Sequence, residues 1–312
     1  MRGRAKGHSA NRYRSVRRTA RSPQVSGTSS LTRIPLVSAI GSFLFHRWTM
    51  HLDYSQSLMD PYRDIAQYYD VEHSDFRDDI EFYLNVVKDG PVLVIGCGTG
   101  RVTAALLDSG LEVWGIDSSP SMIGKARERL GQDSKLRLVC TSMQTLSLNR
   151  RFPVCILPLN TLWHCLHREA QIEGLTAVHA HLTARGTLLI DVSNPLTMVD
   201  RGAEGEMRER FSKNLVDGVV RGSSAAWDDE AEQTLAFSLT YEESRADKSM
   251  LTTARLRLRY LYRFELELLL RLCGFDVRTV YGSYDLDPYG SSSPRILTVA
   301  TPLCRSPRAD GD

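Results

Sequence analysis

Hydrophobic and polar residues follow two alternating patterns from about residue 60 to the end of the chain. One is a short continuous apolar run, such as Pro91–Ile95, which is typical of a strand covered on both faces of a sheet. The other places an apolar residue at every third or fourth position, as on the buried face of a helix. Strands and helices that alternate in this way build a parallel sheet with helices on its faces. We therefore expect an α/β fold.

Seven segments share the apolar, β-branched composition of strands in a buried sheet. They are predicted at residues 91–95, 112–116, 136–140, 154–157, 187–192, 275–281 and 295–301. Helices are predicted at residues 76–87, 102–108, 120–130, 169–183 and 264–273. The last two strands follow each other with no helix between them, so the final strand is expected to run antiparallel. The fold class is thus a doubly wound, mostly parallel seven-stranded sheet with an antiparallel last strand.

Two helix boundaries carry clear local signals. Ser119 precedes the helix Pro120–Leu130 as a capping residue, and Pro120 occupies the first helical position. Gly274 follows the last helix, where glycine commonly adopts a left-handed conformation.

Residues 200–262 interrupt the alternation of strands and helices. Apolar residues alternate with polar ones over 235–241 and again over 256–262, where Arg255, Arg257 and Arg259 fill the polar positions. A period of two is typical of half-exposed strands. We predict two long antiparallel strands joined by a turn at 245–248, which form a small antiparallel β lid.

The resulting domain organisation places the main domain at residues 59–199 and 263–304, the β insertion or lid at 200–262, and a short tail at 305–312. Residues 1–58 form a basic head, because the first 50 residues contain ten Lys or Arg and no Asp or Glu. This head has three interpretations: a disordered segment, a true translation start at Met50 or Met59, or a targeting signal. The first two are favoured, because no small-residue cleavage site follows the apolar run 34–45.

Charge and cysteine content narrow the possible partners and location. Residues 51–312 contain 29 basic and 37 acidic side chains, a net charge of −8, and an acidic surface repels nucleic acid. No apolar run reaches the roughly 20 residues of a transmembrane helix, so we expect no membrane insertion. The six cysteines include no C-x-x-C pair. We therefore expect a reducing, cytoplasmic environment and no metal site.

The residues with the clearest chemical meaning follow the first predicted strand. Gly96-Cys97-Gly98-Thr99-Gly100 lies between that strand and a helix, and Asp117 ends the next strand. Glycines at this point let a ligand approach the backbone, and the carboxylate can accept hydrogen bonds from both ribose hydroxyls. A dinucleotide site of the G-x-G-x-x-G type needs glycine where this chain has Arg101. The pattern therefore indicates a nucleoside site with G-x-G-x-G spacing.

This spacing resembles motif I of class I S-adenosylmethionine (SAM)-dependent methyltransferases. Further segments between residues 60 and 302 resemble consecutive blocks of bacterial small-molecule methyltransferases, some of which carry an antiparallel lid after the fifth strand. The resemblance implies a Rossmann-like methyltransferase fold and SAM as the cofactor.

The resemblance also implies roles for individual residues. The glycines would admit the methionine part of SAM, Asp117 would hold the ribose, Ser142 and Met143 would flank the adenine, and Leu159 and Asn160 would lie beside the sulfonium. The full predicted cofactor-binding set is Gly96, Cys97, Gly98, Gly100, Asp117, Ser118, Ser142, Met143, Leu159, Asn160 and Tyr69. Two positions depart from the family pattern, because Val94 and Ser142 stand where the family often has acidic residues.

Methyl transfer from a sulfonium is an in-line displacement on an activated donor, so positioning supplies much of the rate acceleration. His164, just after the fourth strand, is the candidate base that would take a proton from the methyl acceptor. Alternatively, His164 packs with Trp163 or caps the following helix. Asn194 either orients the acceptor or serves as a turn residue. Tyr62, Tyr68 and Tyr69 are candidates to cover the sulfonium, or else form the apolar face of a helix.

Two polar clusters have an open role. The loop Tyr281–Gly290 is rich in tyrosine and aspartate, and either receives a cationic substrate or forms a turn-rich connection. Arg255, Arg257 and Arg259 either bind a phosphate or form a solvated edge face, and the edge face is favoured.

We therefore predict a SAM-dependent methyltransferase that transfers a methyl group to nitrogen or oxygen of a small molecule. The alternatives are an NAD(P)-dependent oxidoreductase on a related fold and a non-catalytic nucleoside-binding module. A small-molecule substrate is the expected partner, and a homodimer is possible.

Overall fold

The structure is a computed structural model, and it describes residues 60–198, 204–246 and 248–303. The predictions made for the basic head (1–58) and for the tail (305–312) lie outside these ranges.

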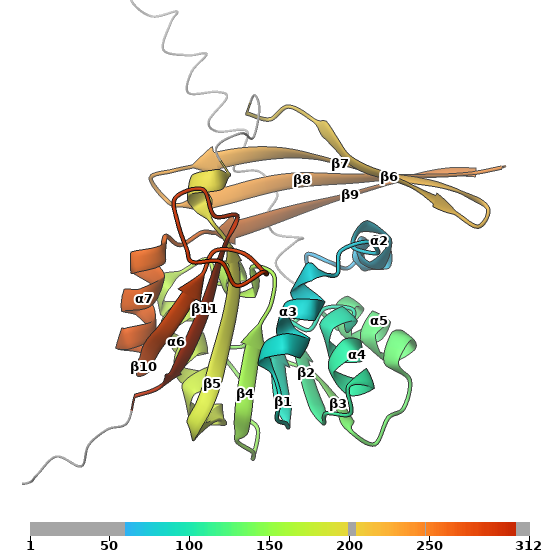
Figure 1. Ribbon diagram of the computed structural model, residues 1–312. Coiled ribbons are helices and arrows are strands. Elements are labelled where there is room, and N and C mark those ends of the chain that lie inside the picture. Colours follow the sequence, from blue (N-terminus) through green and yellow to red (C-terminus); the bar gives the residue numbers. More distant parts are fainter. Residues whose placement is uncertain (1–59, 199–203, 247, 304–312) are drawn as a thin grey trace, which may run out of the picture. The chain divides into compact units, whose positions relative to one another are not determined.

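The central sheet contains seven strands in the order β10-β11-β5-β4-β1-β2-β3 (Figure 1). The strands are β1 (Val92–Ile95), β2 (Val113–Asp117), β3 (Leu136–Cys140), β4 (Phe152–Leu157), β5 (Leu182–Ser193), β10 (Phe275–Tyr281) and β11 (Arg295–Pro302). Strands β1 to β5 pair in parallel, and β11 runs antiparallel to both β5 and β10. The predicted doubly wound α/β sheet with an antiparallel last strand is confirmed.

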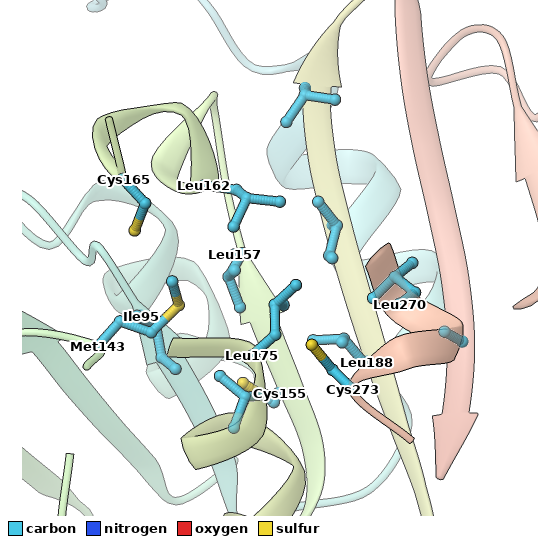
Figure 2. Packing of buried hydrophobic residues seen from close by; sticks show 14 of the residues in the cluster. Ile95, Met143, Cys155, Leu157, Leu162, Cys165, Leu175, Leu188, Leu270 and Cys273 are labelled. Atoms are coloured by element: carbon cyan, nitrogen blue, oxygen red, sulfur yellow. The ribbon is translucent and has the colours of Figure 1, made fainter. Parts of the chain in front are cut away.

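Helices cover both faces of this sheet. They are α2 (Ala66–Glu72), α3 (Asp78–Val86), α4 (Arg101–Asp108), α5 (Pro120–Leu130), α6 (Arg168–His181) and α7 (Arg263–Leu272), with short 3-10 helices η2 (Thr161–His164) and η3 (Pro195–Thr197). Apolar residues of α3, α4 and α5 pack on one face of the sheet, and those of α6 and α7 pack on the other. Figure 2 shows this second layer, where Leu175 of α6 and Leu270 of α7 lie among buried side chains of β4 and β5.

Local sequence signals explain two helix boundaries. The Ser119 hydroxyl accepts a hydrogen bond from the Met122 N–H at 3.0 Å, so α5 begins where the capping signal predicts. Gly274, directly after the C-cap residue of α7, has a φ of +87°, as predicted for a left-handed helix end.

A second, antiparallel sheet has the order β6-β7-β8-β9. Its strands are β6 (Arg208–Leu215), β7 (Gly218–Asp229), β8 (Thr234–Arg245) and β9 (Lys248–Arg259). The pattern of the sequence predicted β8 and β9 but missed β6 and β7, because charged residues dominate β6 and small or polar residues much of β7. Ile65 and Tyr68 pack on Val220, Leu239 and Tyr241, which ties this sheet to the segment around α2.

No helix in the described part of the chain is long and apolar enough to cross a membrane.

Candidate active site

A cavity of about 580 Å³ opens at the carboxyl ends of the parallel strands. Strand β1 lies between β2 and β4, which is the point where the strand order reverses direction. Ligands of open α/β sheets bind outside the strand ends at this point. The cavity is lined by Gly96 after β1, Asp117 at the end of β2 and Leu159 after β4. Its volume falls in the range of about 300–1,000 Å³ that is typical of small-molecule sites.

Most of the predicted cofactor-binding residues line this cavity. They are Gly96, Cys97, Gly98, Asp117, Ser118, Ser142, Met143, Leu159 and Tyr69. Gly100 and Asn160 are not among the lining residues and have other roles, described below.

The glycine loop needs glycine for reasons that differ between positions. Gly96 has a φ of +71°, and an added Cβ would lie 2.3 Å from Oγ1 of Thr161. Gly98 has a φ of +55° and no heavy atom within 4 Å of the position of a Cβ. It lines the cavity, so its backbone is open to a ligand. Gly100 has a φ of +84°, and an added Cβ would lie 2.8 Å from Cδ1 of Leu130 on α5, so the Leu130 side chain would have to shift.

Two backbone groups orient the Asp117 carboxylate. Its Oδ2 accepts a hydrogen bond from the Gly98 N–H at 2.9 Å, and its Oδ1 accepts one from the Ser119 N–H at 2.8 Å. Each oxygen retains acceptor capacity toward the cavity. Burial raises the pKa of Asp117, and the nearby Asp60 carboxylate adds to this, while the backbone N–H groups oppose it. The Asp117 carboxylate is held ready to accept hydrogen bonds from ribose hydroxyls, and the open backbone of Gly98 leaves room for the part of the ligand attached to the ribose. These groups therefore fit SAM.

The loop after β3 supplies another wall of the cavity. Ser142 and Gln144 line it, and the Gln144 amide lies 3.5 Å from the Cys165 thiol. Sequence reasoning missed Gln144, although it follows Ser142 by only two residues. Val94, the other departure from the family pattern, is fully buried inside β1 and does not line the cavity.

The turn after β4 is strained. Leu159 and Asn160 have φ angles of +39° and +63°, which L-residues rarely adopt. The Asn160 side chain binds the end of β5 instead of facing the cavity: its Oδ1 accepts from the Ser193 N–H at 2.7 Å, and its Nδ2 donates to Ser193 Oγ at 3.2 Å. These bonds hold the strained turn in place, and the turn presents Leu159 and Thr161 to the cavity.

An aromatic pair lies across the same cavity. The Tyr62 hydroxyl and Nε2 of His164 are hydrogen-bonded at 3.2 Å, and both residues line the cavity. The His164 ring lines the cavity, and the surrounding protein atoms keep most bulk water away from it. This desolvation disfavours the charged imidazolium and lowers the pKa of His164 to about 4. His164 is therefore neutral at pH 7. Tyr69 also lines the cavity and stacks on His73 with ring centroids 4.2 Å apart, whereas Tyr68 stacks on Tyr241 and does not line it.

Asn194, predicted either to orient the acceptor or to serve as a turn residue, caps the short helix η3 with its side chain. Its side chain is fully buried and is not among the cavity-lining residues. The amide Nδ2 donates to the Ser293 carbonyl at 2.8 Å, and Oδ1 accepts from the Tyr289 hydroxyl at 3.2 Å and from the Leu196 N–H at 3.2 Å. Because these bonds occupy the amide, Asn194 joins the end of β5 to the loop before β11.

The tyrosine-rich loop 281–290 does not line the cavity either. The Tyr284 hydroxyl donates to Oδ2 of Asp191 at 2.9 Å, and the Ser283 hydroxyl donates to Asp287 at 2.8 Å. Asp191 is 1% exposed and also binds Arg295 and the Tyr83 hydroxyl. These contacts support the interpretation of this loop as a turn-rich connection.

A buried ion pair fixes the start of α4 below the glycine loop. Nη1 of Arg101 donates to Oδ1 of Asp79 at 2.8 Å and to the Phe76 carbonyl at 3.0 Å, and Nη2 binds Oδ2 of Asp79. The side chains of Arg101 and Asp79 are 9% and 0% exposed. The pair therefore joins α3 to the first residue of α4.

The four-stranded sheet also reaches the cavity. Arg255, Arg257 and Arg259 lie on β9, which is an edge strand as expected, but all three line the cavity together with Glu232 and Thr234. Arg255 and Arg257 are exposed, as expected for a solvated edge face, and Arg259 is half-buried, so these arginines both meet solvent and face the cavity. Within the described residues, no group of three or more His, Cys, Asp or Glu side chains is placed to hold a metal ion.

Comparisons with known proteins agree with this geometry. A family profile described as a methyltransferase domain matches residues 92–186, which span β1 to the start of β5. An uncharacterized methyltransferase of Geobacillus sp. (strain WCH70) is 31% identical, over 52% of this chain and 76% of its own length. The chain belongs to the class I SAM-dependent methyltransferases.

Two further comparisons cover more of this methyltransferase. The cypemycin N-terminal methyltransferase of a Streptomyces species is 28% identical over 67% of this chain and 81% of its own length. The structure of the CcbJ methyltransferase from Streptomyces caelestis superimposes with a TM-score of 0.68 and 26% identity, over 78% of this chain and 99% of that chain. The predicted fold, enzyme class and cofactor, SAM, are thus confirmed. The comparisons give no support to the oxidoreductase or to the non-catalytic module.

Proposed function

We propose that this methyltransferase acts on an amine nitrogen of a small molecule. The choice of nitrogen over oxygen rests on His164, which lines the cavity in hydrogen-bond contact with Tyr62 and whose pKa is lowered to about 4 by desolvation. An alcohol needs a base to take its proton as the new O–C bond forms, and an imidazole with this pKa is a weak base. An α-amino group has a pKa of about 8 and is partly neutral at pH 7, so its lone pair is available without such a base.

The names of relatives support nitrogen as the target. A relative that matches 67% of this chain is named an N-terminal methyltransferase. A relative from Parasynechococcus marenigrum, 28% identical over 49% of its length, is named a glycine/sarcosine N-methyltransferase. A malonyl-[acyl-carrier protein] O-methyltransferase also matches, but over only 28% of its length.

In this proposal each residue acts by binding or positioning. When bound, SAM supplies a methyl group activated by its sulfonium sulfur. Asp117 would accept hydrogen bonds from the ribose hydroxyls, and the open backbone of Gly98 would admit the adjoining part of the cofactor. The nitrogen lone pair of the acceptor would take the methyl group, and the resulting ammonium would release its proton to solvent. Tyr62 and neutral His164 orient the acceptor and exclude water, which favours a direct approach.

SAM binding tests the cofactor assignment. We expect Asp117→Ala to weaken SAM by about 1–3 kcal/mol, or roughly 5- to 150-fold, because charge-assisted hydrogen bonds are lost. Isothermal titration calorimetry with SAM and with S-adenosylhomocysteine measures this directly. Glu128→Ala, an exposed substitution on α5 that does not line the cavity, is the matched control. Equal affinities for the Asp117 variant and the wild type would show that the ribose assignment is wrong.

Turnover tests the choice of nitrogen. With labelled methyl-SAM and matched primary amines and alcohols, we expect transfer to amines. His164→Asn and His167→Asn, the latter replacing the other cavity-lining imidazole, should each lower kcat by less than about 10-fold. Transfer to alcohols, or a loss of about 10²- to 10⁴-fold as for a removed general base, would overturn the proposal.

We also propose that the protein works in the cytoplasm. The five cysteines in the described ranges are all free, and Cys97, Cys155 and Cys165 are buried, as is usual for proteins of a reducing compartment.

A further inference from the structure

Three arginines form one wall of the active-site cavity, and none of them has an acidic partner among the residues that the structure describes. Arg255, Arg257 and Arg259 are spaced two residues apart on β9, so their side chains project from the same face of the strand. All three line the cavity that contains Gly98 and Asp117. We call these three residues the arginine wall.

The cross-strand neighbours of the arginine wall are small and uncharged. Arg255 pairs with Ser238, Arg257 with Ala236 and Arg259 with Thr234 on the adjacent strand β8. No carboxylate therefore lies directly opposite any of the three on that strand. Residues two apart on one strand are separated by about 7 Å, so the three positive charges repel one another.

The hydrogen bonds of the arginine wall leave most of its donors open. Nη2 of Arg257 donates to Thr234 Oγ1 at 3.2 Å, and Nη1 of Arg259 donates to the Leu166 carbonyl at 3.3 Å. No ion pair within the described ranges includes any of the three arginines. A guanidinium has five N–H donors, so several remain for a ligand.

Three other arginines of the same sheet are paired with carboxylates. Arg208 binds Glu206 at 2.8 Å, Arg210 binds Glu72, and Arg245 binds Asp217 and Glu243 at 2.6 Å each. Arg221 on β7 also forms no ion pair within the described ranges, but it is exposed and does not line the cavity. The arginine wall thus places three unpaired arginines together at the cavity. This contrast is notable because residues 51–312 carry a net charge of −8, so a positive wall is opposite in sign to the body of the protein.

We propose that the arginine wall binds an anionic group of the methyl acceptor, a carboxylate or a phosphate, and thereby directs the acceptor's amine toward the donor end of the cavity. Arginine suits this role, because its planar fork binds both oxyanions through two parallel hydrogen bonds. Glu232 also lines the cavity and provides a carboxylate for the ammonium form of the acceptor as it enters. The substrate class is therefore a small molecule that carries both an amine and an oxyanion. This inference rests on the proposed function.

The test replaces the two more exposed members of the wall, as Arg255→Gln/Arg257→Gln. The matched control is Arg127→Gln/Arg221→Gln, which removes two exposed arginines that do not line the cavity. A second variant, Arg255→Lys/Arg257→Lys, keeps the charge and removes the planar fork. Calorimetry with S-adenosylhomocysteine comes first, because unchanged affinity in all variants shows that the fold and the cofactor site are intact. Failure of the wild type to bind it would count against the proposed function rather than against the arginine wall.

Acceptor specificity is then measured as kcat/KM with labelled SAM on matched triplets: an amine with a carboxylate, the same amine with a phosphate monoester, and its neutral amide or alcohol analogue. We expect the wild type and the control to prefer one anionic member by about 10- to 100-fold, the range for lost charge-assisted hydrogen bonds, and the glutamine variant to lose this preference. The lysine variant should fall between them. Whichever anionic member is preferred identifies the oxyanion as carboxylate or phosphate.

Anion binding gives a readout that does not depend on turnover. With S-adenosylhomocysteine bound, inorganic phosphate or acetate should raise the thermal unfolding temperature of the wild type and the control but not of the glutamine variant. Equal rates for anionic and neutral acceptors, or equal responses to both anions in the glutamine variant and the control, would overturn the inference.

Discussion

The buried pair of Asp79 and Arg101 makes the most quantitative prediction about stability. Replacing Asp79 with asparagine leaves the Arg101 guanidinium, 9% exposed, without a counter-charge. Removing one partner of a buried pair destabilises a protein by about 3–5 kcal/mol. This is a large part of a total stability of about 5–15 kcal/mol. For a domain of this size the expected fall in Tm is about 6–20 °C.

Thermal unfolding followed by circular dichroism, at one scan rate, measures the change. The control is Glu112→Gln, which breaks the pair with Arg150, whose side chains are 35% and 37% exposed. Both side chains of this surface pair are partly exposed to solvent, where an ion pair contributes about 0–1 kcal/mol, so this variant should lie within about 4 °C of the wild type. The double variant Asp79→Leu/Arg101→Met should be more stable than the sum of its single changes by at least about 1 kcal/mol. Equal shifts for Asp79→Asn and Glu112→Gln would refute the reasoning, because they would mean that the Asp79–Arg101 pair is not buried.

Three further changes test other parts of the site. Gly96→Ala places a Cβ 2.3 Å from Thr161 Oγ1, so calorimetry should show loss of SAM binding. The control Gly124→Ala in α5 meets no atom within 4 Å and should raise the free energy of unfolding by about 0.5–1 kcal/mol. Similar effects of the two substitutions would contradict this packing of Gly96. The pKa of His164 is about 4 when folded and about 6.5 when unfolded, so the unfolded state binds more protons between these values, and stability should fall as the pH drops through this window. Urea titrations at several pH values measure the free energy of unfolding of the wild type and of His164→Asn. The variant should lose the fall in stability between about pH 6.5 and 4. Identical pH profiles for the two proteins would show that His164 does not cause this fall. Trp163→Ala removes a side chain that is 0% exposed and should lower the free energy of unfolding by about 3–5 kcal/mol. Urea titration measures this change. A loss below about 1 kcal/mol would be incompatible with the burial of Trp163.

Local sequence signals predicted the elements in which neighbours along the chain decide the conformation. The bounds of α5 match the prediction because its cap and its first-position proline lie next to it in sequence. The glycine loop and Asp117 are close enough along the chain to be recognised as one site, and the structure joins them through the hydrogen bond from the Gly98 N–H.

The strands β6 and β7 show where such signals end. β7 pairs with β8 over twelve residue pairs, but its own sequence mixes glycine, serine and alanine with few apolar residues. Its conformation depends on hydrogen bonds to its neighbour, so periodicity along its own sequence carries little information.

The roles of single polar residues were likewise decided by contacts distant in sequence. Asn194 has the sequence position of an acceptor-binding residue, but Tyr289, 95 residues later, occupies its amide oxygen. Asp191 gave no signal, although it gathers Tyr83, Tyr284 and Arg295.

The sequence by itself therefore determined the α/β class, the nucleoside loop and its ribose carboxylate, because these depend on local turns and on short spacings. Only the tertiary structure decided that the arginines of β9 face the cavity and that Asn194 does not. The direction in which a polar side chain points depends on which distant strand or loop packs beside it, and the pattern of a single chain does not encode that neighbour in any short segment.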